Sequence, residues 1–178
     1  MTPIDSPAPS SLKRRWLLKS ALVLGAVGAT LGSSVFWNRG IAKGQLTERG
    51  RDVFKAMTRA ALSHMLPTDA AQREAKLDAN LTRLNEMVKS MPPSAQMELS
   101  ALLGLLVNAP TRLMVTGLTH SWADASVEEV TQALESMRIH SLPTTMISYH
   151  ALRDLTCIAF FTTPDNWSLS GYSGPLDI

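Results

Sequence analysis

Proline residues divide most of this chain into segments that have helical spacing. They lie at positions 67, 92, 93, 110 and 143, and proline both lacks a backbone N–H and disfavours helical geometry at the residue before it. Between these breaks apolar residues recur at steps of three and four, which predicts one buried face per helix. The first two segments carry Val53, Phe54, Met57, Ala60, Ala61 and Met65, then Leu77, Leu81, Leu84, Met87 and Val88.

The later segments continue this pattern. A helix that begins at Pro93 is apolar nearly all round, which predicts a central place in the core, and a short helical piece follows over 111–118. Ser126 and Glu129 form a capping box that opens the next helix. A last long helix is expected from about 144 to 161, and its apolar positions are Ile147, Leu152, Leu155, Ile158 and Ala159.

The predicted fold class is therefore all-α, an irregular bundle of about five or six helices. An N-terminal signal or anchor helix precedes the bundle, and an extended C-terminal tail with the sequence TTPDNWSLSGYSGPLDI follows it. No segment alternates between apolar and polar residues, so no strand is predicted. A domain of roughly 130 residues is large enough for a modest core without disulfides or metals.

Charge is divided unevenly along the chain. Residues 1–43 contain six basic residues and one acidic residue, a net charge of +5, whereas residues 44–178 contain eleven basic and fourteen acidic residues, a net charge of −3. The basic excess belongs to the N-terminal segment. The predicted helical domain therefore lacks the basic balance of a nucleic-acid-binding protein, and no nucleic acid is expected among its partners.

The N-terminal segment has the layout of a secretory leader. Residues 20–38 form a run of 19 residues without charge, directly after a basic cluster. The stretch 13–19 of that cluster resembles the twin-arginine export signal, Ser/Thr-Arg-Arg-x-Phe-Leu-Lys, although Lys13 replaces the usual Ser or Thr and Leu17 replaces the commonest Phe. Receptors of the export machinery recognise such signals as addresses. The matching positions are Arg14, Arg15, Leu17, Leu18 and Lys19.

A second interpretation of this segment stays open. In an ordinary signal anchor the arginines would only set topology through the positive-inside rule, and an uncleaved run of 19 residues is just long enough to span a bilayer. The sequence leaves open whether the leader is removed. Two units are predicted, a twin-arginine signal or membrane anchor over 1–43 and a helical domain over 44–178, and both interpretations place that domain in the periplasm.

Residues that could perform chemistry are sparse. The four histidines, at positions 64, 120, 140 and 150, include no pair with the spacing that puts two metal ligands on one helical face. The stretch 170–174 looks like a nucleophile elbow, but it lies in a Pro- and Gly-rich tail and not between a strand and a helix. We therefore predict no catalytic residue and no metal ligand, and the chain is not expected to be an enzyme by itself.

Cys157 and the late aromatic residues allow two interpretations each. An unpaired cysteine in an exported protein is either a buried thiol or the site of a bond to another chain. The aromatic residues either pack onto the helices of this chain or anchor a second protein, as Trp and Tyr commonly do at interfaces. The aromatic residues in question are Trp122, Phe160, Phe161, Trp167 and Tyr172.

These features together resemble the small subunit of membrane-associated flavin dehydrogenases, the family typified by the third subunit of gluconate 2-dehydrogenase. The resemblance rests on the twin-arginine leader, on RAALSHMLPTD at residues 59–69, and above all on the C-terminal segment. That segment has YHALRDLT at 149–156, the aromatic pair at 160–161, PDNW at 164–167 and GYSGP at 171–175. It departs from the family in its Phe pair, where tyrosines are more usual, and in Ser173, where proline is common.

The resemblance implies a non-catalytic accessory subunit of an oxidoreductase complex, with residues 44–178 as the accessory domain. The large partner holds FAD and oxidises a sugar, polyol, alcohol or sugar acid, and a cytochrome c subunit often receives the electrons. The small subunit assists maturation of the leaderless FAD subunit and carries it through the twin-arginine translocase. The resemblance also favours an intersubunit disulfide at Cys157 and a partner interface at Phe160, Phe161, Trp167 and Tyr172.

Two other interpretations remain. The chain could be an exported or anchored helical protein with a structural role in the envelope, or a free-standing enzyme with an unrecognised site. No cofactor is expected in this chain under the accessory-subunit interpretation, since the FAD belongs to the partner.

Overall fold

The computed structural model describes residues 39–174. The export-signal residues Arg14, Arg15, Leu17, Leu18 and Lys19, and the predicted N-terminal helix, lie outside the described residues. The elements in chain order are β1 (Ile41–Ala42), β2 (Gln45–Leu46), α2 (Glu48–Ala61), η1 (Ser63–Met65), α3 (Ala70–Ser90), α4 (Pro93–Val107), α5 (Ala109–Thr116), α6 (Val127–Arg138), α7 (Pro143–Phe161) and η2 (Pro164–Ser170). Helices account for most of the described chain, which confirms the predicted all-α class.

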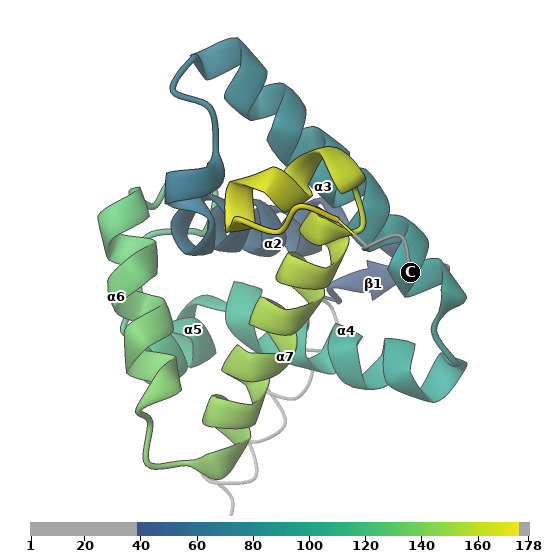
Figure 1. Ribbon diagram of the computed structural model, residues 1–178. Coiled ribbons are helices and arrows are strands. Elements are labelled where there is room, and N and C mark those ends of the chain that lie inside the picture. Colours follow the sequence, from purple (N-terminus) through teal and green to yellow (C-terminus); the bar gives the residue numbers. More distant parts are fainter. Residues whose placement is uncertain (1–38, 175–178) are drawn as a thin grey trace, which may run out of the picture.

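The helices are arranged around α2, which packs against α3, α4, α6 and α7. Figure 1 shows α7 crossing in front of α2, with α6 beside it and the turn between α6 and α7 at the lower end of the molecule. The core lies where these helices meet, because each turns its apolar face inward. The largest fully buried side chains include Phe54, Met57, Leu77, Leu84, Leu103, Met137, Leu152 and Phe160.

Helix ends follow the local sequence. Thr47 and Asp69 cap α2 and α3 by accepting hydrogen bonds from backbone N–H groups three residues on. The predicted capping box of α6 is confirmed: Glu129 N–H donates to Ser126 Oγ at 3.2 Å, and Ser126 N–H donates to the Glu129 carboxylate at 2.8 Å. The first predicted helix ends earlier than its apolar pattern, because α2 stops at Ala61 and a 3₁₀ turn carries the chain to Pro67.

A short β-hairpin precedes α2, and no pattern in the sequence predicted it. Ile41 pairs with Leu46 and Ala42 with Gln45, around a two-residue turn in which Lys43 and Gly44 both have positive φ. Strands of two residues are too short to show alternation. The hairpin crosses the predicted boundary between 43 and 44 and lies close against α4, since a Cβ on Gly40 would stand 2.1 Å from Leu103 Cβ.

Helix α4 is less central than its composition predicted. Leu99, Leu103 and Leu106 are buried, whereas Met97 and Leu105 are exposed. The hairpin, α2 and α5 cover one side of α4, and among the described residues little else packs against the other. An apolar composition all round the helix therefore does not place it inside the core here.

The C-terminal tail is folded, at least to Gly174, and is not extended as predicted. Residues 164–170 form the 3₁₀ helix η2, which ends at Gly171 in the left-handed conformation. Asn166 Nδ2 donates to the Phe160 carbonyl at 2.6 Å, and Trp167 Nε1 donates to the Phe161 carbonyl at 2.7 Å. The last carbonyls of a helix lack partners within the helix, and these two side chains hold the tail on the end of α7 by supplying donors.

Candidate functional site

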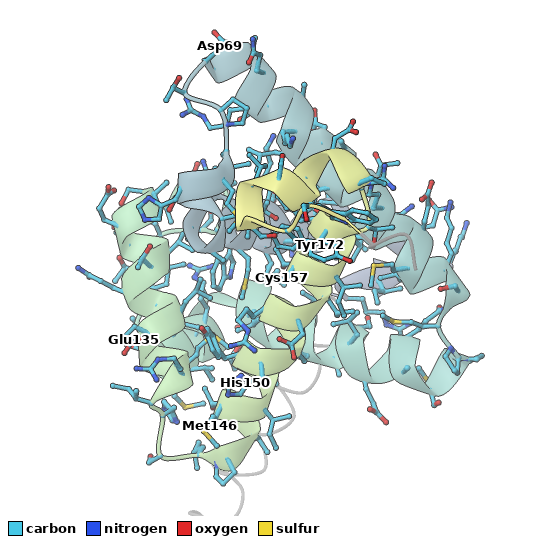
Figure 2. All side chains as sticks on the ribbon, in the orientation of Figure 1. Asp69, Glu135, Met146, His150, Cys157 and Tyr172 are labelled. Carbon is cyan, nitrogen blue, oxygen red and sulfur yellow. The ribbon has the colours of Figure 1, made fainter. Side chains whose placement is uncertain are left out.

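An open groove lies between α2, α6 and α7 and contains the single cysteine. Its volume is about 450 Å³. Figure 2 shows Cys157 on α7 facing the side of the helix on which α6 and Glu135 lie. We call this site the α6–α7 groove, and its lining residues are Met57, Ala60, Ala61, Thr131, Leu134, Glu135, Tyr149, Arg153 and Cys157.

Helical spacing explains why these residues meet. Tyr149, Arg153 and Cys157 are four residues apart, so they lie one above the other on α7. The adjacent face of α7 carries Leu152 and Thr156, which are buried and hold the helix against the core. On the opposite wall, α2 contributes Met57 and the methyl groups of Ala60 and Ala61, and the two small alanines leave room that larger side chains would fill.

The thiol of Cys157 is half-buried and makes no disulfide. Burial raises its pKa, because the charged thiolate is poorly solvated there; Arg153 lowers the pKa and Asp154 raises it, both to a smaller extent. The thiolate is the reactive form in disulfide exchange. Cys157 is therefore protonated and slow to react at neutral pH, yet open to a partner that enters the groove.

The polar groups at the rim of the groove are paired with one another. Arg153 bonds Asp154 at 2.8 Å and lies over the Tyr149 ring, with Cζ 5.8 Å from its centroid. Arg138 bonds Glu135 at 2.6 Å. These exposed pairs add little to stability, but they leave the rim near neutrality and the interior of the groove largely apolar.

The predicted interface aromatics divide into two groups. Phe160 is 1% exposed and belongs to the core of this chain, so the prediction that its side chain contacts a partner is wrong. Phe161 is half-buried and packs edge to face against it, with ring centroids 5.3 Å apart. Trp167 is half-buried and Tyr172 is 51% exposed, and their centroids lie 5.6 Å apart. Of these four residues, Tyr172 has the most exposed side chain.

Trp122 packs within this chain, which is the first of the two interpretations given for the aromatic residues. It is buried, and its Nε1 donates to the Leu106 carbonyl at 2.7 Å. This bond satisfies the one polar atom of the indole inside the core. Trp122 therefore stabilises the junction between α4 and the loop before α6, and its side chain is not available to a partner.

The turn between α6 and α7 exposes an apolar cluster that includes Ile147, which the helical pattern had assigned to the buried face of the last helix. Ile147 is 63% exposed, and Ile158 on the same face of α7 is exposed as well. The helical spacing could have predicted the exposure of Ile147 and Ile158, because neither residue lies on the helix face that carries Leu152 and Thr156. The exposed residues at the turn are Ile139, Leu142, Met146 and Ile147.

The histidines are dispersed. His120 Nδ1 lies 2.7 Å from a Glu129 oxygen, His140 Nδ1 accepts from the Leu142 N–H at 3.1 Å, and His150 packs against Tyr149. Between residues 39 and 174, no three His, Cys, Asp or Glu side chains lie close enough together to hold a metal ion. In the same part of the chain no single helix has the length and composition to cross a membrane; α4 and α5 pass only together, with a bend of 90°.

The chain matches no protein-family model, and searches against curated proteins and solved structures find no significant similarity.

Proposed function

We propose that this chain is the non-catalytic small subunit of a periplasmic flavin dehydrogenase of the GMC type, one that oxidises a sugar, polyol or alcohol. In this role it assists maturation of a leaderless FAD subunit and carries it, already folded, through the twin-arginine route. The leader-like sequence at residues 13–38 and the C-terminal resemblance support the proposal. A cytochrome c subunit is a further proposed partner, and the complex resides in the periplasm at the inner membrane.

The observation that carries the proposal is the position of Cys157 in an open, largely apolar groove. A segment of the large subunit that fills the α6–α7 groove would cover the thiol and the Tyr149 ring. A specific interface buries at least about 1,000 Å², so contact must extend beyond the groove. The aromatic pair Trp167 and Tyr172, which follows the C-terminal end of α7, is the nearest candidate.

Cys157 can link the two subunits covalently. Joining two thiols into a disulfide removes two electrons and two protons, and exchange with an oxidised disulfide carrier of the periplasm accepts them. Non-reducing electrophoresis of the purified complex tests this step. A band at the summed mass that disappears with reductant, and is absent from Cys157→Ser, is expected; two separate bands from the wild type would exclude the bridge.

Export is tested by changing the arginines without changing the charge. Arg14→Lys combined with Arg15→Lys keeps both positive charges but removes the rigid guanidinium fork. Co-expressed with the FAD subunit, this variant is expected to leave dehydrogenase activity in the cytoplasm. Arg39→Lys, the same substitution outside the motif, is the matched control and is expected to export normally. Periplasmic activity in the double variant would contradict the proposed carrier role.

The exposed apolar cluster at the α6–α7 turn favours one second candidate, a structural protein of the envelope that contacts the membrane surface. The two candidate functions predict different binding partners that can be identified when the chain is purified. Purification from the periplasm with a flavoprotein in fixed proportion supports the accessory subunit. A stable chain that binds lipid vesicles and brings down no flavoprotein supports the envelope protein.

A further inference from the structure

Helices α4 and α5 carry an exposed apolar surface, in addition to the cluster at the turn between α6 and α7. Met97 is 69% exposed, Leu113 52% and Met114 71%. Figure 1 shows both helices in the lower half of the molecule, away from the start of α3. We call this surface the α4–α5 face, and its exposed residues are Met97, Ala101, Leu105, Pro110, Leu113 and Met114.

The α4–α5 face carries almost no charge. Between residues 99 and 119 the sequence has one charged residue, Arg112, and its side chain is buried. The exposed side of α3, by contrast, carries Glu74, Asp78 and Lys89. Charged and polar residues normally cover the solvent side of a surface helix. A contiguous apolar surface therefore indicates contact with another molecule or with a membrane.

The backbone at the bend between α4 and α5 is paired inside the protein. The last carbonyl groups of a helix lack partners within the helix and must find donors elsewhere, from side chains or from water. Here side chains donate to three successive carbonyl groups at the end of α4. These bonds run from Thr111 Oγ1 to Leu105, from Trp122 Nε1 to Leu106 at 2.7 Å, and from Arg112 Nη1 to Val107 at 3.4 Å. The bend can therefore lie against lipid, where unpaired backbone groups are not tolerated.

The chain enters the described domain beside this face. Gly40 lies against α4, since a Cβ there would stand 2.1 Å from Leu103 Cβ. The 38 residues that come before the described part of the chain include the uncharged run 20–38, for which the sequence predicts a leader or anchor. A leader that stays attached would therefore hold α4, among the described helices, close to the bilayer.

The composition of the α4–α5 face favours lipid over a protein partner. Residues 97–117 contain no aromatic residue and no exposed arginine, the types that most often anchor protein interfaces. Arg39 and Lys43 are exposed in the hairpin that packs on α4, against the one acidic residue of α4, Glu98. Basic residues beside an apolar face are attracted to anionic lipid headgroups.

We propose that the α4–α5 face rests on the surface of the membrane. Leu105, Leu113 and Met114 lie among the upper parts of the acyl chains, and Arg39 and Lys43 contact anionic headgroups. Amphipathic helices bind the membrane interface in this manner, with only their apolar side buried. The inference holds for either candidate function, because it concerns how the domain meets the membrane and not which protein accompanies it.

A dye attached at single positions tests the proposal in the full-length chain. In Cys157→Ser, one new cysteine, Leu105→Cys or Met114→Cys, is labelled with the environment-sensitive dye NBD. On vesicles of phosphatidylcholine and phosphatidylglycerol, both labels should shift to shorter wavelength and be quenched by lipids with a nitroxide on the acyl chain. Ala75→Cys, at an exposed position of α3, is the matched control and should show neither effect. Quenching of a label in Ile147→Cys, with none in the first two variants, would overturn the proposal.

The same labels distinguish lipid from a protein occupant. Without vesicles, addition of the FAD subunit should leave the emission of the Leu105→Cys and Met114→Cys labels unchanged. A shift to shorter wavelength on adding it would overturn the proposal, because the α4–α5 face would then be a protein interface. Thermal unfolding of each labelled variant shows whether the fold is kept.

Discussion

The α6–α7 groove and the pocket on the other side of α7 differ in how their polar groups are paired, and this difference bears on what each can bind. In the α6–α7 groove the charged residues at the rim pair with each other, the interior is largely apolar, and the volume is about 450 Å³. A second pocket, the α3 pocket, is lined by Lys76, Asn80, Arg83, Asp165 and Asn166 among others and has a volume of about 140 Å³. Within residues 39–174 the side-chain oxygens of its two buried asparagines have no hydrogen-bond donor. An apolar, neutral groove is suited to a large partner, whereas the α3 pocket is small and lined mainly by polar side chains.

Helix α7 forms a wall of both sites, so its packing can be tested first. Phe160→Ala removes a fully buried ring beside the α3 pocket and is expected to lower the free energy of unfolding by about 3–5 kcal/mol. Urea denaturation measures the loss. Ile158→Ala is the control on the same helix, because Ile158 is exposed, and a change below about 0.5 kcal/mol is expected. Similar losses in both variants would show that Phe160 is not a core residue.

The hydrogen bond behind Asn80 gives the next largest effect. Thr58 Oγ1 donates to the Phe54 carbonyl and accepts from Asn80 Nδ2. Thr58→Val keeps the shape and leaves the Asn80 amide unpaired in the core, so the free energy of unfolding should fall by about 1–3 kcal/mol. Thr82→Val, on the exposed side of α3, should change it by less than about 0.5 kcal/mol. Equal effects would mean that Thr58 does not hold Asn80 in place.

Filling each hollow in turn distinguishes their roles in partner binding. Ala61→Trp places a large ring in the α6–α7 groove, and Ala79→Trp does the same at the α3 pocket; both alanines are exposed and on helices. If the FAD subunit enters the groove, Ala61→Trp should weaken its binding at least about tenfold, which is about 1.4 kcal/mol. Ala79→Trp should leave it near the wild-type value.

Titration of the two purified variants with the FAD subunit measures this difference. Thermal unfolding of each variant alone shows whether the fold is kept. Weaker binding by Ala79→Trp than by Ala61→Trp would move the proposed interface to the other side of α7.

Sequence alone predicted the helices well where the pattern was long and periodic, and it predicted the α6 cap from Ser126 and Glu129. The hairpin was missed because two-residue strands carry no pattern. The burial of Phe160 could have been predicted, since it continues the inward face of Leu152 and Thr156 at helical spacing. The tail was predicted as extended because its turn formers do not show that Trp167 donates to the end of α7.

The two sites were less accessible to sequence reasoning than the helices. Cys157 stood out because it is the single cysteine, but the groove around it depends on Ala60 and Ala61, which belong to a helix about 100 residues earlier in the chain. The α3 pocket gave no sequence signal, because Asn80 and Asn166 become unpaired acceptors only once α3 and η2 are placed against α7. Such tertiary burial of polar groups has no local pattern.

The smallest expected effect concerns the thiol itself. Because burial raises the Cys157 pKa, the rate of its alkylation should reach half of its maximum at a pH above the ordinary thiol value of about 8.5. Arg153 stabilises the thiolate and Asp154 destabilises it. Arg153→Gln should therefore move this midpoint further up, and Asp154→Asn should move it down.

Because Arg153→Gln and Asp154→Asn are expected to shift the pH midpoint of alkylation in opposite directions, each variant serves as a control for the other. If both substitutions merely weakened the packing of α7, the thiol would become exposed and both midpoints would fall toward the ordinary thiol value. Shifts in opposite directions show that the folded rim of the α6–α7 groove sets the reactivity of Cys157, whereas a common direction would show that the two charges act only by changing how tightly the helix packs.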